Sequence, residues 1–383
     1  MADSFTHFSL QILLICITLF FTFSTFASAT DTKSRPFKKI YAFGDSFTDT
    51  GNTRSTTGPN GFGHVSNLPY GSTFFHRSTN RYSDGRLMID FVAETLSLPF
   101  LPPYRGLKGN PSNGVNFAVA GSTAINHAFF VKNNLSFDVT PQSIQTQIIW
   151  FNEYLQKQGC KGSASSSPQC RAAFEDALIW VGEIGVNDYA YITGSSVSSD
   201  TIRKLAISSV TGFLQALLSK GVKYVVVQGL PPTGCLTMAM TLAPEDDRDE
   251  MGCVKSVNNQ TRTHNAVYQA KLRDLSRQFP NATIAYLDYW NAYRKIVTNP
   301  AAYGFKEPFK ACCGSGDPPY NFAVFATCGT TSATACPNPA QYINWDGVHL
   351  TEAMYKVLTG MFLNGTYSKP PFQNLLAKKQ HEG

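Results

Sequence analysis

Short apolar runs recur along the chain, and between them lie longer stretches in which apolar residues return every three or four positions. The runs occupy residues 40–43, 177–181, 224–227 and 283–287. Because their apolar character is continuous rather than alternating, they are typical of strands buried on both faces of a parallel sheet. We therefore expect these four segments to form the centre of one such sheet.

Amphipathic stretches between and after these runs predict five helices, at residues 87–98, 144–158, 201–220, 257–279 and 352–363. Asp200 is the expected N-cap of the third helix, and Gly221 its C-terminal stop. Strands that alternate with helices predict an α/β fold, here a three-layer α/β/α sandwich around a mainly parallel sheet. No Pro/Ser-rich linker and no internal repeat divides the sequence, so residues 30–383 are expected to form a single domain.

The first 29 residues have the features of a secretory signal peptide. An apolar run from Leu10 to Phe23 precedes Ala27-Ser28-Ala29, whose small side chains suit a cleavage site. No Lys or Arg precedes the run, and the alternative is an uncleaved membrane anchor. The run has 14 residues, whereas a bilayer requires roughly 20. We expect a secreted protein with no stable membrane span.

The cysteines agree with an oxidising compartment. Cys16 lies in the predicted signal peptide, and the remaining eight are Cys160, Cys170, Cys235, Cys253, Cys312, Cys313, Cys328 and Cys336. An even number in a secreted chain predicts disulfides, and short separations favour Cys160–Cys170 and Cys235–Cys253. Cys312 and Cys313 then pair with Cys328 and Cys336, in an order that the sequence leaves open. No histidine lies at zinc-finger spacing beside them, so disulfides are favoured over zinc.

Surface chemistry is indicated by sequons and by charge. Asn-x-Ser/Thr sequons at Asn134, Asn259, Asn281 and Asn364 predict exposed, N-glycosylated sites in a secreted chain. The formal net charge is +6, yet the longest charged stretch, 245–250, is mostly acidic, so nucleic-acid binding is not expected. No cluster of His, Asp and Glu has metal-ligand spacing, and we expect neither a metal nor another cofactor.

A candidate nucleophile follows the first predicted strand. Gly44-Asp45-Ser46 begins directly after residues 40–43, and a serine hydroxyl there needs a base within hydrogen-bond reach. Asn187 follows the strand at 177–181, and the carboxyl ends of parallel strands meet at one edge of the sheet. Ser46 and Asn187 are therefore expected at the same edge. All residues of Gly-Asp-Ser also favour turns, so the triplet alone favours a plain turn over a catalytic serine.

A candidate base and its orienting acid lie about three hundred residues further on. In Asp346-Gly347-Val348-His349 the acidic and imidazole side chains share one face of a turn. Asp346 can then hold the Nδ1–H of His349 and leave Nε2 facing Ser46. The alternative is a helix-capping role for His349. His264 is a rival base but lies within a predicted helix without a carboxylate at this spacing, and the loop histidines 64, 76 and 127 also lack such a partner.

Four sequence blocks in this order resemble the plant type of the GDSL, or SGNH-hydrolase, family of esterases and lipases. They are Gly44–Phe47, Asn116–Gly121, Gly185–Asp188 and Asp346–His349, and the resemblance extends from Lys39 to about Leu363. The sequences at 182–189 and 344–353 are most similar to the branch that includes sinapine esterase and acetylajmalan esterase. Residues 229–235 resemble the family's Leu-Pro-Pro-x-Gly-Cys block, which we interpret as structural.

The resemblance implies an SGNH-hydrolase fold and a serine esterase mechanism. Ser46, Asp346 and His349 would be catalytic. The oxyanion hole would consist of the backbone N–H groups of Ser46 and Gly121 and the side-chain amide of Asn187. Without the family pattern, Gly121 is also compatible with a helix start and Asn187 with a turn.

The expected function is that of a secreted carboxylesterase that forms an acyl-Ser46 intermediate. Its substrate would be an acetyl, hydroxycinnamoyl or short-acyl ester of a plant metabolite or of a wall glycan. Two alternatives stay open: an acyltransferase using the same acyl-enzyme, and a catalytically silent protein that binds the wall or acts in defence. We expect a monomer located in the apoplast, with the vacuole as the alternative.

Overall fold

A six-stranded sheet lies at the centre of the computed structural model, which describes residues 35–53, 63–135 and 140–382. The predicted signal peptide at 1–29 lies outside these ranges. Residues 36–383 form one compact unit, to which the description below applies. Across the three described ranges, no helix has both the length and the apolar character needed to cross a membrane.

The strand order is β10-β5-β4-β3-β1-β2, with every neighbouring pair parallel except β10 and β5. The strands are β1 (Lys39–Phe43), β2 (Gly114–Asn116), β3 (Ala177–Val181), β4 (Tyr224–Gln228), β5 (Thr283–Leu287) and β10 (Ser368–Lys369). All four strands predicted from continuous apolar runs are present, and they are neighbours at the centre of the sheet. The short edge strands β2 and β10 were not predicted.

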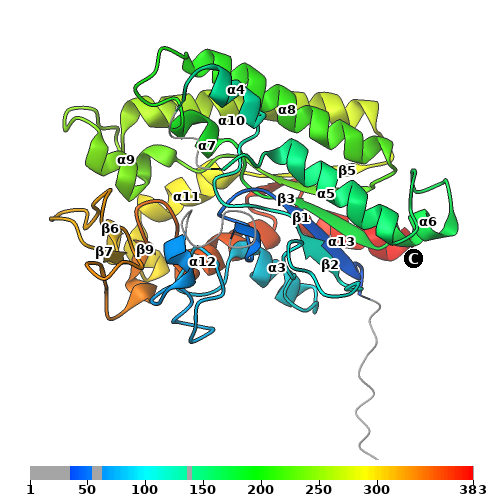
Figure 1. Ribbon diagram of the computed structural model, residues 1–383, viewed down its shortest axis with the longest axis horizontal. Helices are drawn as coiled ribbons and strands as arrows, with labels where there is room; N and C mark the ends of the chain where they lie inside the picture. The colour runs from blue at the N-terminus through cyan, green and yellow to red at the C-terminus, as the bar shows by residue number, and fades with distance from the viewer. Residues whose placement is uncertain (1–34, 54–62, 136–139, 383) are drawn as a thin grey trace, which may run out of the picture. The chain divides into compact units, whose positions relative to one another are not determined.

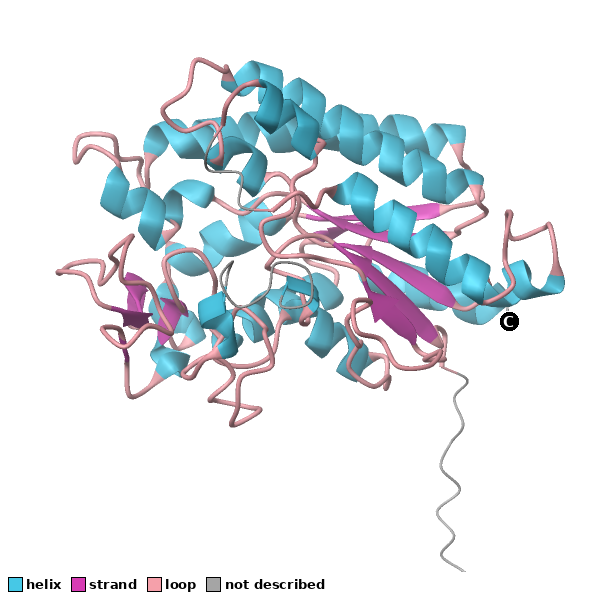
Figure 2. Ribbon diagram, in the orientation of Figure 1, coloured by secondary structure: helices cyan, strands magenta, loops and turns pink. Residues whose placement is uncertain are grey.

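Helices cover both faces of the sheet (Figures 1 and 2). One layer contains α5 (Ile144–Lys157), α8 (Ser199–Ser219) and α10 (Lys255–Gln278). The other contains α3 (Met88–Thr95), α11 (Tyr289–Val297), α12 (Glu352–Leu363) and α13 (Phe372–Glu382). Successive side chains of β1 point to opposite faces, so Tyr41 and Phe43 join the first apolar core and Ile40 and Ala42 the second. The predicted α/β/α sandwich is confirmed.

Shorter elements complete the fold. The helices are α4 (His127–Lys132), α6 (Pro168–Phe174), α7 (Val186–Ala190), α9 (Thr237–Leu242), η2 (Gly63–Ser66), η3 (Thr233–Cys235), η4 (Pro300–Tyr303) and η5 (Pro339–Gln341). Two small sheets pair β6 (Glu307–Ala311) with β9 (Tyr342–Asn344) and β7 (Cys313–Gly314) with β8 (Thr334–Ala335). These two sheets build the part of the chain that leads to Asp346.

The N-cap prediction for the helix at 201–220 was wrong. α8 begins at Ser199, and the side chain of Ser198 accepts a hydrogen bond from the backbone N–H of Thr201. Asp200 instead lies in the first turn, where its negative charge interacts favourably with the positive end of the helix dipole. Gly221 follows the C-cap residue Lys220 with φ +92°, a backbone conformation that glycine adopts without strain.

The described residues form four disulfides. Cys160–Cys170 and Cys235–Cys253 are the two pairs that short separation favours. The order that the sequence left open is Cys312–Cys336 and Cys313–Cys328. Cys235–Cys253 lies beside the C-terminal edge of the sheet, and the pairs of Cys312 and Cys313 lie in the β6–β9 region. Cys160–Cys170 closes the loop that runs from α5 into α6.

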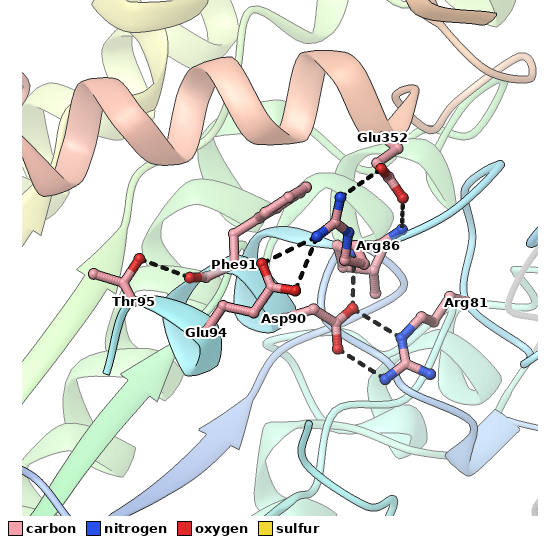
Figure 3. Close-up of polar contacts among 8 residues, drawn as sticks. Arg81, Arg86, Asp90, Phe91, Glu94, Thr95 and Glu352 are labelled. Carbon is pink, nitrogen blue, oxygen red and sulfur yellow. Dashed lines mark hydrogen bonds and ion pairs between the residues drawn. The ribbon is translucent and has the colours of Figure 1, made fainter. Parts of the chain in front are cut away.

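Charged side chains tie the segment before α3 to the start of α12 (Figure 3). The guanidinium of Arg81 makes two hydrogen bonds of 2.8 Å to the Asp90 carboxylate, and both side chains are nearly inaccessible. Arg86 bonds to Glu94 and to Glu352, the first residue of α12. A side chain at Gly85 would overlap the Glu352 carboxylate, so the close approach requires glycine. This network fixes the helix that begins three residues after His349.

We expect Arg81→Ala to lower the free energy of unfolding by about 3–5 kcal/mol, because Asp90 would remain buried without its charge partner. Urea denaturation monitored by fluorescence measures the change. Arg277→Ala is the matched control, since it removes an exposed ion pair to Asp274 and should cost less than about 1 kcal/mol. Equal losses in the two variants would show that the buried pair is not special.

Candidate active site

Ser46 lies in a tight turn at the carboxyl end of β1. The turn starts at Gly44, whose φ of +143° is strained for any other residue. Within it, Oδ1 of Asp45 accepts the N–H of Phe47 at 3.0 Å, and the carbonyl of Asp45 accepts the N–H groups of Thr48 and Asp49. These local bonds present Ser46, which is 5% exposed, at the edge of the sheet.

A glutamine on α5 clamps this turn from outside. Oε1 of Gln147 accepts the N–H of Gly44 at 3.0 Å, and Nε2 of Gln147 donates to the carbonyl of Gly44 at 2.7 Å. Nε2 also donates to Oγ of Ser122 at 3.3 Å. Gln147 is fully buried, so it satisfies both polar groups of a backbone residue that water does not reach. The nucleophile turn is thereby attached to the helix layer.

Asp346 and His349 form the pair that the sequence predicts. Nδ1 of His349 lies 2.9 Å from Oδ2 of Asp346, and Oδ1 accepts the backbone N–H groups of Val348 and His349 at 2.7 Å each. Burial acts to raise the pKa of Asp346, but the charge of His349 and these hydrogen bonds outweigh it and lower the pKa to about 2. Asp346 is therefore ionised at neutral pH and can orient the imidazole.

The opposite nitrogen of the imidazole is unoccupied. Nε2 of His349 is buried and has no hydrogen-bond partner among the residues that the structure describes, Ser46 included. The ring of Phe47, the residue after Ser46, lies 5.5 Å from the imidazole, and the ring of Tyr82 lies 4.6 Å from it. Catalytic hydrogen bonds are often long before substrate binds, so the free Nε2 next to the Ser46 turn is compatible with a general base.

The second and third sequence blocks meet beside the Ser46 turn. Nδ2 of Asn187, in α7, donates to Oδ2 of Asp45 at 3.0 Å and to the carbonyl of Ser122 at 2.9 Å. The preceding residue, Gly121, has φ +78°. Within the described ranges, the backbone N–H groups of Ser46 and Gly121 donate to no other atom. The Asn187 amide thus joins Asp45 and Ser122, the neighbours of Ser46 and Gly121 in the sequence.

α7 also holds the Gly121 loop through two further side chains. The carboxylate of Asp188 accepts the N–H groups of Ala124 and Ile125 at 2.8 Å each. The hydroxyl of Tyr191, just beyond α7, donates to the carbonyl of Gly121 at 2.8 Å. Burial raises the pKa of Asp188 to about 7, although the two N–H donors oppose the rise. The loop that carries Gly121 is therefore positioned by the helix that carries Asn187.

A second buried carboxyl group lies against Asp45. Glu183 is fully buried after β3, and burial together with the neighbouring Asp45 raises its pKa well above the usual range. Burial also raises the pKa of Asp45, against the hydrogen bonds that it accepts. The pair is best described as an ionised Asp45, which receives the Phe47 and Asn187 hydrogens, beside a protonated Glu183. Two adjacent carboxylates in a dry site would repel each other.

His264, the rival base in the sequence, occupies a different environment. It is buried in α10, and its Nδ1 lies 3.0 Å from the hydroxyl of Tyr189. Burial lowers its pKa to about 3, so the ring is neutral at physiological pH. Among the described residues, no carboxylate orients it in the way that Asp346 orients His349.

The four sequon residues Asn134, Asn259, Asn281 and Asn364 are all exposed, and their glycosylation stays a prediction.

Comparison with known proteins identifies the family. A family model described as GDSL-like Lipase/Acylhydrolase matches residues 40–359. The chain belongs to this family. A GDSL esterase/lipase of Arabidopsis thaliana is 62% identical over 372 residues, covering 95% of each chain. A second GDSL esterase/lipase of that plant is 38% identical over 94% of each chain, and the sinapine esterase of Brassica napus is 38% identical over 95% of each.

The GDSL assignment confirms the family, the fold class and the enzyme class, an ester-bond hydrolase, that the sequence predicts. Among solved structures, an acetylxylan esterase of Geobacillus stearothermophilus is 14% identical, with a TM-score of 0.38, over 85% of this chain and 93% of its own. This likeness is too low to add to the assignment.

Sequence reasoning missed three residues of this GDSL site: Gln147, Glu183 and Tyr70, whose hydroxyl donates to Oδ2 of Asp346 at 2.8 Å. Glu183 lies inside the block at 182–189. An acidic residue between Gly182 and Gly185, directly after a predicted strand, could have been noticed in the sequence. Gln147 is an ordinary residue of an amphipathic helix, and Tyr70 lies in a loop. Their roles depend on tertiary contacts that their neighbours in sequence do not encode.

Gln147→Leu should reduce kcat and lower the free energy of unfolding by about 1–3 kcal/mol, because the N–H of Gly44 would be buried without a partner and its carbonyl would keep only the N–H of Val119. Ester hydrolysis and urea denaturation measure the two effects. Gln156→Leu, an exposed position on the same helix, is the control and should change neither. A Gln147→Leu enzyme that matches this control would contradict the clamp.

His264→Gln should reduce the loss of unfolding free energy that occurs as the pH falls. The unfolded chain binds a proton at His264 below about pH 6.5 and the folded chain only near pH 3, so acid favours unfolding. Between these values, His264 should cost the wild type about 1.4 kcal/mol per pH unit relative to the variant. Unfolding free energies of both proteins from pH 7 to pH 4 test this. A constant difference across that range would mean that His264 is not held neutral.

Proposed function

We propose that the chain is a secreted serine carboxylesterase that cleaves its substrate through an acyl intermediate on Ser46. The arrangement around His349 is the observation that supports this most. Asp346 holds Nδ1, the buried Nε2 has no partner within the described residues, and Phe47 brings the Ser46 turn against the same ring. A base that is oriented on one side and free on the other is what nucleophilic catalysis by serine requires.

In the proposed reaction, Nε2 of His349 takes the hydroxyl proton as Oγ of Ser46 attacks the ester carbonyl carbon. The imidazolium then donates this proton to the leaving alcohol as the ester C–O bond breaks, and the acyl group stays on Ser46. Water repeats the sequence and releases the acid. Asp346 remains ionised throughout and stabilises the imidazolium, in agreement with its low pKa.

The proposed oxyanion hole has two donors ready and one engaged. The N–H groups of Ser46 and Gly121 can donate to the developing oxyanion directly. The two hydrogens of the Asn187 amide are already bonded to Asp45 and Ser122. Its contribution requires that one of these bonds be shared with the oxyanion or exchanged for it. Such preorganised donors stabilise the charge that develops in the transition state.

Two segments that contact the catalytic turn support an ester with an apolar part. The N–H of Met238, in α9, donates to the carbonyl of Gly347 at 2.8 Å, and Leu242 on the same helix is 63% exposed. The ring of Phe322 packs on Gly347, and nearby Phe325 is fully exposed. Leu242 and Phe325 are thus exposed apolar side chains on two segments that contact this turn. We propose an acetyl, hydroxycinnamoyl or short-acyl ester of a plant metabolite or wall glycan.

Secretion is supported by the disulfides and by the N-terminal sequence. All eight cysteines of the predicted mature chain are paired, which is typical of proteins that fold in an oxidising compartment. The apolar run before Ala27-Ser28-Ala29 fits a signal peptide. We propose release to the apoplast, with delivery to the vacuole as the second destination.

Ser46→Ala should lower kcat by roughly 1,000-fold or more, because it removes the nucleophile. The assay uses secreted, purified protein and a panel of 4-nitrophenyl acetate, 4-nitrophenyl palmitate, a hydroxycinnamoyl choline and acetylated xylan. We expect turnover of the acetyl or hydroxycinnamoyl esters and little of the palmitate. Ser208→Ala, an exposed serine on α8, is the control and should leave turnover unchanged.

The products distinguish the alternatives. An excess of alcohol acceptor should not divert the acyl group if the enzyme is a hydrolase, whereas an acyltransferase would form a new ester at the expense of free acid. Turnover that survives Ser46→Ala would contradict the proposed nucleophile. Absence of turnover on every ester of the panel would favour a binding role for the site.

A further inference from the structure

We infer that Tyr70 is a positioning residue of the acid–base pair, which holds the Asp346 carboxylate in line with His349. This inference rests on the proposed function, in which His349 is the general base. The hydroxyl of Tyr70 donates to Oδ2 of Asp346 at 2.8 Å, across a separation of 276 residues. It is a buried contact made by a side chain that belongs to none of the four GDSL blocks.

The donors to Asp346 fall into two groups. Oδ1 accepts the N–H groups of Val348 and His349, which belong to the same turn and accompany the carboxylate wherever the turn lies. Nδ1 of His349 lies 2.9 Å from Oδ2 and 3.1 Å from Oδ1, and the hydroxyl of Tyr70 donates to Oδ2. Among the hydrogen bonds of the described residues, Tyr70 supplies the donor to Asp346 from outside the turn. Tyr70 therefore helps to fix the rotation of the Asp346 carboxylate about the Cβ–Cγ bond.

Tyr70 is itself rigidly placed. Its side chain is 5% exposed, and its ring makes edge contacts with Trp345 at 5.9 Å and with Tyr82 at 6.2 Å. Tyr82 in turn covers the imidazole of His349. Burial and the charge of Asp346 raise the pKa of Tyr70 well above its usual range, so its hydroxyl keeps its proton and always acts as the donor. The two neighbouring tyrosines thus contact both members of the pair: Tyr70 contacts Asp346, and Tyr82 contacts His349.

The other ionisable groups that face the pair come from three elements: Asp45 in the nucleophile turn, Tyr82 in the loop before α3, and Tyr355 in α12. Burial keeps the two tyrosines protonated across the working pH range. Asp45 and its neighbour Glu183 do not contact Tyr70 through any hydrogen bond of the described residues. A change made at Tyr70 alone is therefore read against an unchanged background.

Removing the Tyr70 hydroxyl has two expected consequences. The carboxylate gains rotational freedom, so kcat should fall about tenfold, as expected for a lost hydrogen bond to a charged group. KM should stay nearly constant, since Tyr70 does not touch the substrate. Without the Tyr70 hydrogen bond, the Asp346 carboxylate would also stabilise the imidazolium form of His349 more strongly. His349 would then be protonated at higher pH, so the acid limb of kcat/KM should move to higher pH.

The test is Tyr70→Phe, with Tyr41→Phe as the matched control. Tyr41 is also buried, and its hydroxyl donates to the carbonyl of Ala173 at 3.3 Å, away from the turn. Both variants lose one buried hydroxyl and its hydrogen bond, so both should lose some stability, but only Tyr70→Phe should change kcat and the acid limb. In an Asp346→Asn background, assayed at raised enzyme concentration, Tyr70→Phe should have little further effect, because the two residues act through one contact.

A second variant keeps the fold and the hydroxyl. Replacing Tyr70 with 3-fluorotyrosine makes the hydroxyl a stronger donor, so the acid limb should move in the opposite direction, to lower pH. If Tyr70→Phe resembles Tyr41→Phe in kcat and pH profile, or if fluorination moves the acid limb to higher pH, the inference is overturned. Ser46→Ala, assayed in parallel, separates this failure from failure of the proposed function, which requires Ser46 whatever Tyr70 does.

Discussion

The buried carboxylate of Asp45 is the interaction on which the site depends most. A charge that water cannot reach must receive hydrogen bonds from the protein, and Asp45 takes them from two directions. The N–H of Phe47 shapes the nucleophile turn, and the amide of Asn187 brings α7 and the Gly121 loop to that turn. One desolvated charge therefore makes the ends of β1 and β3 a single unit. The protonated Glu183 beside it keeps the net charge of this unit low.

Around this centre, distant segments are attached one by one. Gln147 fixes the backbone of Gly44 from the helix layer on one face of the sheet. On the other face, Arg86 and Asp84 hold the start of α12, three residues after His349. The proposed nucleophile, Ser46, and the proposed base, His349, thus come from opposite ends of the chain, and contacts from both helix layers bring them together. Their relative position follows from the sandwich as a whole.

The sequence predicted the parts of the fold whose physical cause is local. Continuous apolar runs such as 177–181 identified the central strands, and α12 was predicted with its observed bounds, Glu352–Leu363. Short elements such as β2 and β10 were missed because pairing with a neighbour, rather than their own residues, makes them strands. The cap of α8 was assigned to Asp200 instead of Ser198, a difference of two residues between equally good capping side chains.

The same division holds for the site. The Asp-x-x-His spacing carries its own geometry, so Asp346 and His349 were predictable as a pair. Gln147 and Tyr70 act on residues 103 and 276 positions away, and a single sequence gives no sign of such contacts. The engagement of both Asn187 hydrogens was equally invisible, because it depends on where Asp45 and Ser122 lie in space.

The backbone that leads into Asp346 is attached to two adjacent cystines. The N–H of Cys312 donates to the carbonyl of Asn344, and the N–H of Cys313 donates to the carbonyl of Trp345. Each of these cysteines is tied to a partner in the following loop, Cys336 and Cys328. Redox conditions during folding therefore become part of the active site's construction. A chain made where thiols stay reduced would contain every side chain of the proposed site, yet the segment that positions Asp346 would lack both of these cross-links.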